Sequence, residues 1–138
     1  MTSQADIGEQ KTVLIVEDHS LLRQVMREFL QSAFPACRFR EAADGAGALE
    51  ACTAYRPQLV LMDVCLPDAN GIELTARLEI LYPGIRVIIV SHRTGEVYVQ
   101  QALAAGAWFV AGNGQVHHGR HDTKWKRYAR ARTGNRTG

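Results

Sequence analysis

The stretch Leu59-Val60-Leu61-Met62-Asp63 decides the fold, because four apolar residues in a row end in a carboxylate. A second apolar run, Val13-Leu14-Ile15-Val16, ends in the same way at Glu17-Asp18. Apolar runs without alternation indicate strands that are buried on both faces, as in a parallel sheet. The carboxyl ends of such strands share one edge, where ligands bind. Glu17, Asp18 and Asp63 should therefore meet in one pocket that suits a divalent cation and a phosphoryl group.

The rest of the chain alternates between strand and helix patterns. Strands are predicted over residues 11–16, 38–42, 58–63, 85–90 and 107–111, and helices over 20–34, 46–55, 71–82 and 94–105. Ser20 is the expected N-cap of the first helix, on which six apolar residues share one face: Leu21, Leu22, Val25, Met26, Phe29 and Leu30. The repeated order predicts an α/β fold with a doubly wound, five-stranded parallel sheet.

Composition points to one domain inside the cell. A chain of 138 residues suits a single domain. Residues 1–10 are polar and are predicted to be a disordered leader rather than a signal peptide. No apolar run approaches the roughly 20 residues that cross a bilayer, so no membrane contact is expected. The three cysteines match no metal-binding spacing and indicate reduced thiols, so we expect a cytoplasmic protein.

Charge divides the chain into an acidic part and a basic tail. Residues 1–114 hold nine Lys and Arg against thirteen Asp and Glu, a net charge of −4. Residues 115–138 hold seven Lys and Arg against the single acid Asp122, a net charge of +6. The predicted organisation is therefore a leader (1–10), a folded domain (11–111) and a basic, atypical C-terminal tail (112–138).

Two motifs resemble the receiver domain of two-component response regulators. They are Val-Leu-Ile-Val-Glu-Asp-His-Ser-Leu-Leu-Arg (13–23) and Leu-Val-Leu-Met-Asp-Val-Cys-Leu-Pro-Asp-Ala-Asn-Gly (59–71). The resemblance covers residues 11–111 and implies the flavodoxin-like receiver fold. The Glu-Asp-His start also resembles the subgroup whose output is a helix-turn-helix DNA-binding domain. Such domains are signalling modules, so we do not expect an enzyme.

The resemblance implies that Asp63 accepts a phosphoryl group from a sensor histidine kinase. By the same resemblance Asp18 and Asp63 coordinate Mg²⁺ directly, Glu17 acts through water, and the backbone carbonyl of Cys65 completes the protein ligands. These roles agree with the residue types, because Mg²⁺ prefers hard oxygen ligands and neutralises the charge of a phosphoryl group in transfer. Without a cation, the clustered acids would repel one another and raise a pKa.

Two further positions match the family's switch residues. Ser91 ends the predicted fourth strand, where the family has a hydroxyl that donates to the phosphoryl oxygen. A serine that merely ends a strand or caps a helix is the alternative. Phe109 matches the aromatic whose rotamer couples to that hydroxyl, and the alternative is an ordinary core aromatic.

The pattern departs from the family after the fifth strand. Counting from Phe109, the family's lysine should stand at position 112, where this chain has Gly112. A polar stretch also replaces the amphipathic helix, so the fifth helix is predicted to be atypical or missing. The lysine would supply positive charge where negative charge accumulates, so its absence predicts that phosphorylation is slowed or that its conformational readout is uncoupled. One hypothesis for both departures is a shift of the coding frame near Trp108, which the nucleotide sequence would test.

Three functions remain open on these grounds. The first is the phosphoacceptor receiver, which could form a homodimer and would contact DNA only through an output domain not present in this chain. The second is a degenerate receiver that binds proteins without phosphorylation, through the region Glu96–Leu103. The third is nucleic-acid binding by the tail, where Trp125 and Tyr128 lie among Lys and Arg residues. A solvated tail is the alternative to the third.

Overall fold

The computed structural model describes residues 11–90, 96–112 and 115–118. Strands and helices alternate through most of this range. In chain order they are β1 (Thr12–Val16), α2 (Ser20–Ala33), β2 (Arg38–Ala42), α3 (Gly45–Tyr55), β3 (Leu59–Met62), α4 (Gly71–Leu81), β4 (Arg86–Val90), α5 (Glu96–Ala104), β5 (Phe109–Gly112) and β6 (Gln115–His118). The predicted βα order is confirmed. The predicted leader and most of the predicted tail lie outside the described residues.

The sheet has the strand order β2-β1-β3-β4-β5-β6. The first five strands of this order are parallel to one another, as predicted. The register sets Val16 beside Met62 and Met62 beside Ile89, so β1, β3 and β4 end at one level. This level is the edge at which the acidic residues were expected.

A sixth strand extends the sheet beyond the predicted boundary at residue 111. β6 runs antiparallel to β5, with Phe109 opposite His118 and Gly112 opposite Gln115. Five strands were predicted because the polar residues after 112 do not form a strand pattern. The dipeptide Asn113-Gly114 between the two strands is the pair favoured in two-residue hairpin connections, and it was the signal for β6.

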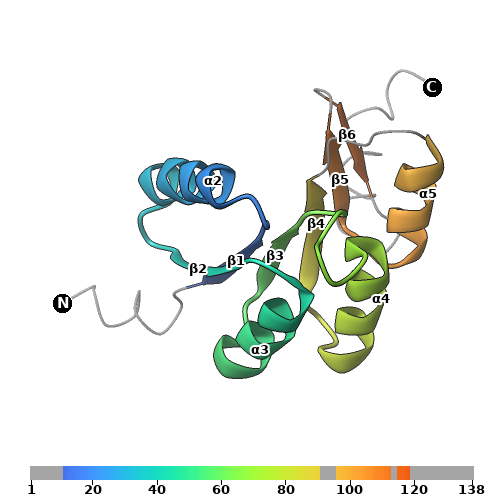
Figure 1. Cartoon of the computed structure of the whole chain (residues 1–138), viewed down its shortest axis with the longest axis horizontal. Coiled ribbons are helices and arrows are strands. Elements are labelled where there is room, and N and C mark those ends of the chain that lie inside the picture. Colours follow the sequence, from blue (N-terminus) through green and yellow to red (C-terminus); the bar gives the residue numbers. More distant parts are fainter. Residues whose placement is uncertain (1–10, 91–95, 113–114, 119–138) are drawn as a thin grey trace, which may run out of the picture.

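One face of the sheet is well covered. Figure 1 shows α3, α4 and α5 side by side along it. The sheet contributes Leu14, Val60 and Ile89 to the core on this face, and α4 contributes Leu78, all of them almost inaccessible to solvent. Burial on this scale, at about 25 cal/mol per Å² of apolar surface, provides most of the driving force for folding.

The opposite face carries α2 alone among the described helices (Figure 1). Met26 and Leu30 of α2 pack against the smaller core around Val13, Ile15 and Phe39. Beside them lies an apolar cavity of about 530 Å³, whose lining includes side chains of α2, of its C-cap residue and of three strands: Leu30, Phe34, Phe39, Leu59, Leu61 and Ile88. We call this side of the sheet the open face.

Two expectations for α2 are corrected. Its N-cap is His19 rather than Ser20, because the His19 ring nitrogen Nδ1 accepts the Leu22 N–H at 3.2 Å. The apolar face predicted for α2 is also buried only in part. Leu21 and Phe29 are 63% and 71% exposed, since no described helix packs beside them.

Candidate functional site

Three carboxylates meet at the carboxyl edge of the sheet, as the sequence predicted. Glu17 and Asp18 follow β1, Asp63 follows β3, and each offers an oxygen atom within 4.8 Å of the others. Glu17 and Asp63 are buried, with 7% and 8% of their surfaces exposed, whereas Asp18 is exposed. We call these three residues the acidic cluster.

Backbone hydrogen bonds fix the two strand ends that carry the cluster. The Glu17 N–H donates to the Ala42 carbonyl at 3.0 Å, and the Asp63 N–H donates to the Val16 carbonyl at 3.1 Å. The sheet ladder therefore continues into the acidic residues themselves. Their main chain is held as firmly as that of the strands, so the carboxylates start from rigid positions.

The negative charges of the acidic cluster repel one another. Burial raises the pKa of Glu17, and the charges of Asp63 and Asp18 raise it further. The His19 N–H donates to Glu17 Oε2 at 3.1 Å, and this hydrogen bond offsets part of the increase in pKa. Neighbouring negative charges disfavour the ionised carboxylate, and a bound cation would reverse that preference.

This set of donors fits Mg²⁺. Mg²⁺ takes hard oxygen ligands, usually from one or two carboxylates, and keeps several of its waters. Two buried carboxylates with a third on the exposed side provide such ligands and leave one side open to water and to a phosphoryl group. Among the described residues, this is the one group of three acidic, His or Cys side chains close enough to share a metal ion.

The loop after Asp63 folds tightly against α4. The Gly71 N–H donates to the Val64 carbonyl at 2.8 Å, and the backbones of Cys65 and Asn70 form an isolated antiparallel β-bridge. A Cβ atom on residue 71 would collide with the Asp63 carbonyl oxygen, so a glycine is required by this close approach. The Asn70 side chain caps α4 by accepting the Ile72 N–H at 2.8 Å.

The other predicted site residues are placed less completely. Ser91 lies outside the described residues, so its role stays a prediction. Phe109 is half-buried and lies level with Ile88, two residues before the strand end at Val90. Its switch role and the Cys65 carbonyl ligand also stay predictions. Gly112 is the last residue of β5, at the position where the lysine was expected.

Two residues near the site have contacts that sequence reasoning missed. Asp68, in the loop after β3, accepts the Gly45 and Ala46 N–H groups at 2.7 and 3.0 Å at the start of α3. These hydrogen bonds lower the pKa of Asp68. Arg23 donates to the Glu17 carbonyl, and no local sequence pattern predicts this contact between a helix and a loop.

Comparison with known proteins identifies this arrangement. Residues 13–110 match the response regulator receiver domain family. The chain belongs to that family. Members of the family are signalling modules rather than enzymes, and receiver domains bind Mg²⁺ through an acidic pocket of this kind. They are phosphorylated by histidine kinases.

Two curated relatives illustrate the match of this receiver domain. The chemotaxis protein CheY of Halobacterium salinarum is 34% identical over 97 residues, which is 70% of this chain and 79% of CheY. The transcriptional regulatory protein DegU of Brevibacillus brevis is 33% identical over 102 residues, 73% of this chain and 43% of DegU. The chain thus spans less than half the length of the transcriptional regulators that it matches.

A solved structure confirms the receiver fold. The signal receiver domain of a DNA-binding response regulator from Colwellia psychrerythraea superposes with a TM-score of 0.73 at 19% identity, over 91% of this chain and 99% of that one. At this identity the likeness concerns the fold alone. In the described part of the receiver, no helix is both long and apolar enough to span a membrane.

Proposed function

We propose that this receiver accepts a phosphoryl group on Asp63 from a sensor histidine kinase, with Mg²⁺ held by the acidic cluster. The observation that carries the proposal is the meeting of the buried Asp63 with Glu17 and Asp18 within 4.8 Å. Asp63 follows the central strand β3, so its main chain is fixed in position relative to the incoming phosphoryl group. Phosphoryl transfer needs mainly such positioning and charge neutralisation.

Each member of the cluster has a separate role in this proposal. Asp63 is the nucleophile, whose carboxylate oxygen bonds to phosphorus as the donor's imidazole nitrogen leaves with the bonding electrons. Asp18, on the exposed side, and Asp63 would hold Mg²⁺ directly, and the buried Glu17 would contribute through water. Mg²⁺, when bound, would neutralise negative charge on the phosphoryl oxygens. Ser91, Phe109 and the Cys65 carbonyl keep the roles that the family resemblance implies for them.

The output of the receiver is proposed by analogy with its relatives. DegU is named as a transcriptional regulatory protein. We infer that this receiver also controls transcription, through an output domain that it regulates. Homodimerisation on phosphorylation would be the means of passing on the signal.

Phosphorylation can be tested with a small phosphodonor. Acetyl phosphate and Mg²⁺ should add the mass of one phosphoryl group to the intact chain, as measured by mass spectrometry. Asp63→Asn should abolish the increase. Asp68→Asn is the matched control, because its carboxylate is nearby but accepts N–H groups of α3 instead. An unchanged mass increase in Asp63→Asn would contradict the assignment.

A phosphorylation-independent binding module is the second candidate function. Gly112 favours it, because the chain has no side-chain cation at the position where the family has its lysine. In that case Asp63 would not be phosphorylated, and the region of α5 (Glu96–Leu103) would contact a partner protein directly. The absence of a mass increase in the experiment above, together with the absence of Mg²⁺ binding in a calorimetric titration, would support this second function.

A further inference from the structure

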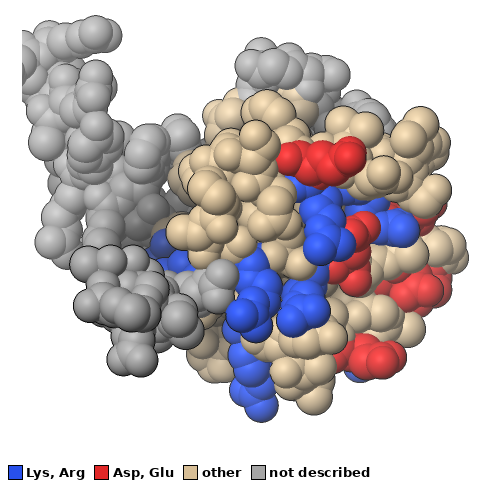
Figure 2. All heavy atoms as spheres, turned by 90° about the vertical axis from the view of Figure 1, so that its left-hand side faces the viewer, with Lys and Arg blue, Asp and Glu red and all other residues tan. Residues whose placement is uncertain are grey.

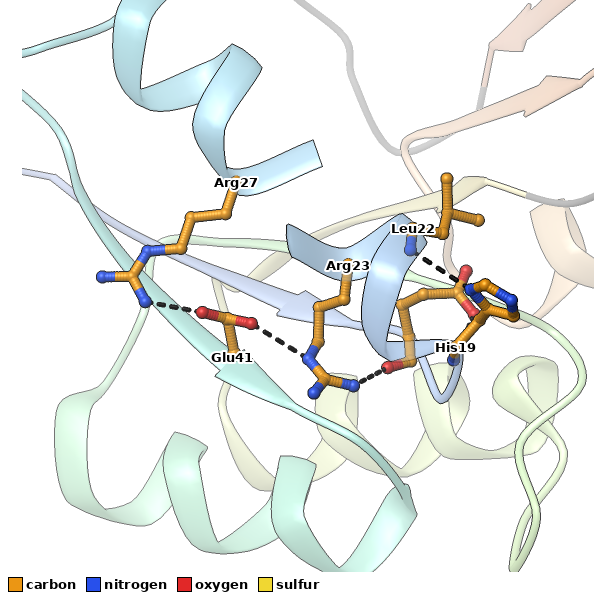
Figure 3. A network of polar contacts seen from close by, with 6 residues as sticks. His19, Leu22, Arg23, Arg27 and Glu41 are labelled. Atoms are coloured by element: carbon orange, nitrogen blue, oxygen red, sulfur yellow. Dashed lines mark hydrogen bonds and ion pairs between the residues drawn. The ribbon is translucent and has the colours of Figure 1, made fainter. Parts of the chain in front are cut away.

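Arg23 links the acidic edge of the sheet to the neighbouring strand β2 (Figure 3). Its Nη1 donates to the backbone carbonyl oxygen of Glu17 at 2.7 Å. Its Nε donates to Glu41 Oε1 at 3.0 Å. Arg27, one helical turn further along α2, donates to the other oxygen of the Glu41 carboxylate at 2.5 Å. Arg23 therefore holds the loop after β1 and a side chain of β2 at the same time.

The carbonyl that Arg23 binds belongs to the peptide group between Glu17 and Asp18. That group is planar, so fixing its oxygen also fixes the direction in which the main chain leaves Glu17 and enters Asp18. Both carboxylates of the β1 side of the cluster start from this peptide. The guanidinium thus acts on the backbone that carries the cluster, because it donates to the Glu17 carbonyl as well as to Glu41.

His19 also holds the loop after β1 that Arg23 contacts. Its N–H donates to Glu17 Oε2, and its ring caps α2 by accepting the Leu22 N–H (Figure 3). Arg23 lies one turn into α2, and its own N–H donates to the His19 carbonyl at 2.9 Å. The first turn of α2, the loop and the cluster are therefore one hydrogen-bonded unit.

Arginine is the residue type that this geometry requires. Its planar fork can donate to two acceptors in fixed directions, whereas a lysine ammonium is a flexible point charge. Glu41 is a suitable anchor for the fork. Partial burial acts to raise the pKa of Glu41, but the hydrogen bonds and charges of Arg27 and Arg23 outweigh it and lower the pKa.

We propose that Arg23 is a positioning residue, which holds the Glu17–Asp18 backbone in the arrangement that binds Mg²⁺ beside Asp63, with Glu41 orienting its guanidinium. This inference rests on the proposed function of the acidic cluster. Groups that orient metal ligands from outside the coordination shell typically change metal affinity by about 10- to 100-fold when they are removed. Because Arg23 acts through a backbone carbonyl, we expect the lower end of that range.

Arg27 offers a matched control on the same helix. Arg23 and Arg27 both pair with Glu41, but among the described residues Arg27 makes no hydrogen bond to Glu17. Mg²⁺ titration of the full chain by isothermal calorimetry should give a dissociation constant about tenfold higher for Arg23→Ala than for the parent. Arg27→Ala should leave that constant within about twofold, because it removes only an ion pair in which the Arg27 side chain itself is exposed. A merely stabilising role predicts that both variants unfold at lower temperature and bind Mg²⁺ like the parent.

Two further variants keep the test decisive if Arg23→Ala does not fold, as judged by circular dichroism. Arg23→Lys retains the charge but not the fork, and it should also weaken Mg²⁺ binding. Glu41→Gln retains an acceptor oxygen but loses the charge, so its effect should be smaller and in the same direction. Parent-like Mg²⁺ affinity in the folded Arg23 variants would overturn the positioning role alone. Failure of the parent itself to bind Mg²⁺ would overturn both this role and the proposed function.

Discussion

The two faces of the central sheet are covered to very different extents. On one face α3, α4 and α5 bury side chains such as Leu78, which has no exposed surface. On the open face, α2 has no fully buried residue, and an apolar cavity of about 530 Å³ lies beside it. Both faces use similar apolar strands, so the number of helices packed on each face makes the difference. Local pattern places apolar residues on a face, but a second element must be present before they are buried.

The side that carries α2 is also mixed in charge. Figure 2 shows Lys and Arg next to Asp and Glu there among the described residues, without a broad patch of a single sign. The described part of this side therefore gives no support to nucleic-acid binding, which relies on clustered positive charge. The tail on which that alternative depended lies outside the described residues, beyond His118.

The largest expected effect tests the covered face directly. Leu78→Ala should lower the free energy of unfolding by about 2–5 kcal/mol, because it leaves a cavity in the main core. Leu21→Ala, the same change on the open face, should stay within about 0.5 kcal/mol, since Leu21 is 63% exposed. Urea unfolding of both variants gives the comparison. Equal losses would mean that the open face is buried in solution.

A second prediction concerns the contact between the covered face and the acidic edge. Gly71→Ala should cost about 1–3 kcal/mol, because the added methyl group forces the start of α4 away from the Asp63 backbone. It should also weaken Mg²⁺ binding, since Asp63 moves with its carbonyl. Ser32→Ala on the exposed surface of α2 is the control for an added or lost small group. A Gly71→Ala variant with parent-like stability would show that the approach is less close than described.

A third prediction uses the pH dependence of the acidic edge, where the two faces meet. The pKa of folded Glu17 is raised above its ordinary value of 4.5, so the folded state holds a proton that the unfolded chain releases. The stabilisation that this Glu17 proton provides should therefore decrease as pH rises from 4.5 to the raised pKa, and it is lost completely above that pKa. Asp63→Asn or added Mg²⁺ should recover a few degrees of melting temperature at pH 7 and little at pH 4. Thermal unfolding monitored by circular dichroism measures this, and recovery of the same size at both values would contradict it.

The smallest expected effect on stability is at the open face itself. Phe29→Ser should change the free energy of unfolding by no more than about 0.5 kcal/mol, because the ring is 71% exposed. Exposed apolar surface favours association, so the variant should self-associate less than the parent in sedimentation velocity at high protein concentration. Increased self-association of the variant would show that Phe29 packs within its own chain.

Much of the fold follows from local pattern. The runs before Glu17 and Asp63 predict buried parallel strands, and the strand β2 has the predicted bounds Arg38–Ala42. The strand β6 was not predicted because its polar residues do not form a strand pattern, although Asn113-Gly114 is a dipeptide typical of hairpins. The N-cap of α2 was assigned to Ser20, whereas the nitrogen of the His19 ring takes that role one residue earlier.

The acidic cluster was predictable for a simple reason: parallel strands end at a common edge, so residues that follow two such strands must lie near each other. No sequence rule predicted that Arg23 would donate to the Glu17 carbonyl or that Asp68 would accept N–H groups at the start of α3. Nor did any rule predict that Leu21 and Phe29 would stay exposed. These features depend on distances between segments far apart in the chain. Periodicity describes which way a side chain points along its own element, and only the packed structure decides what it meets there.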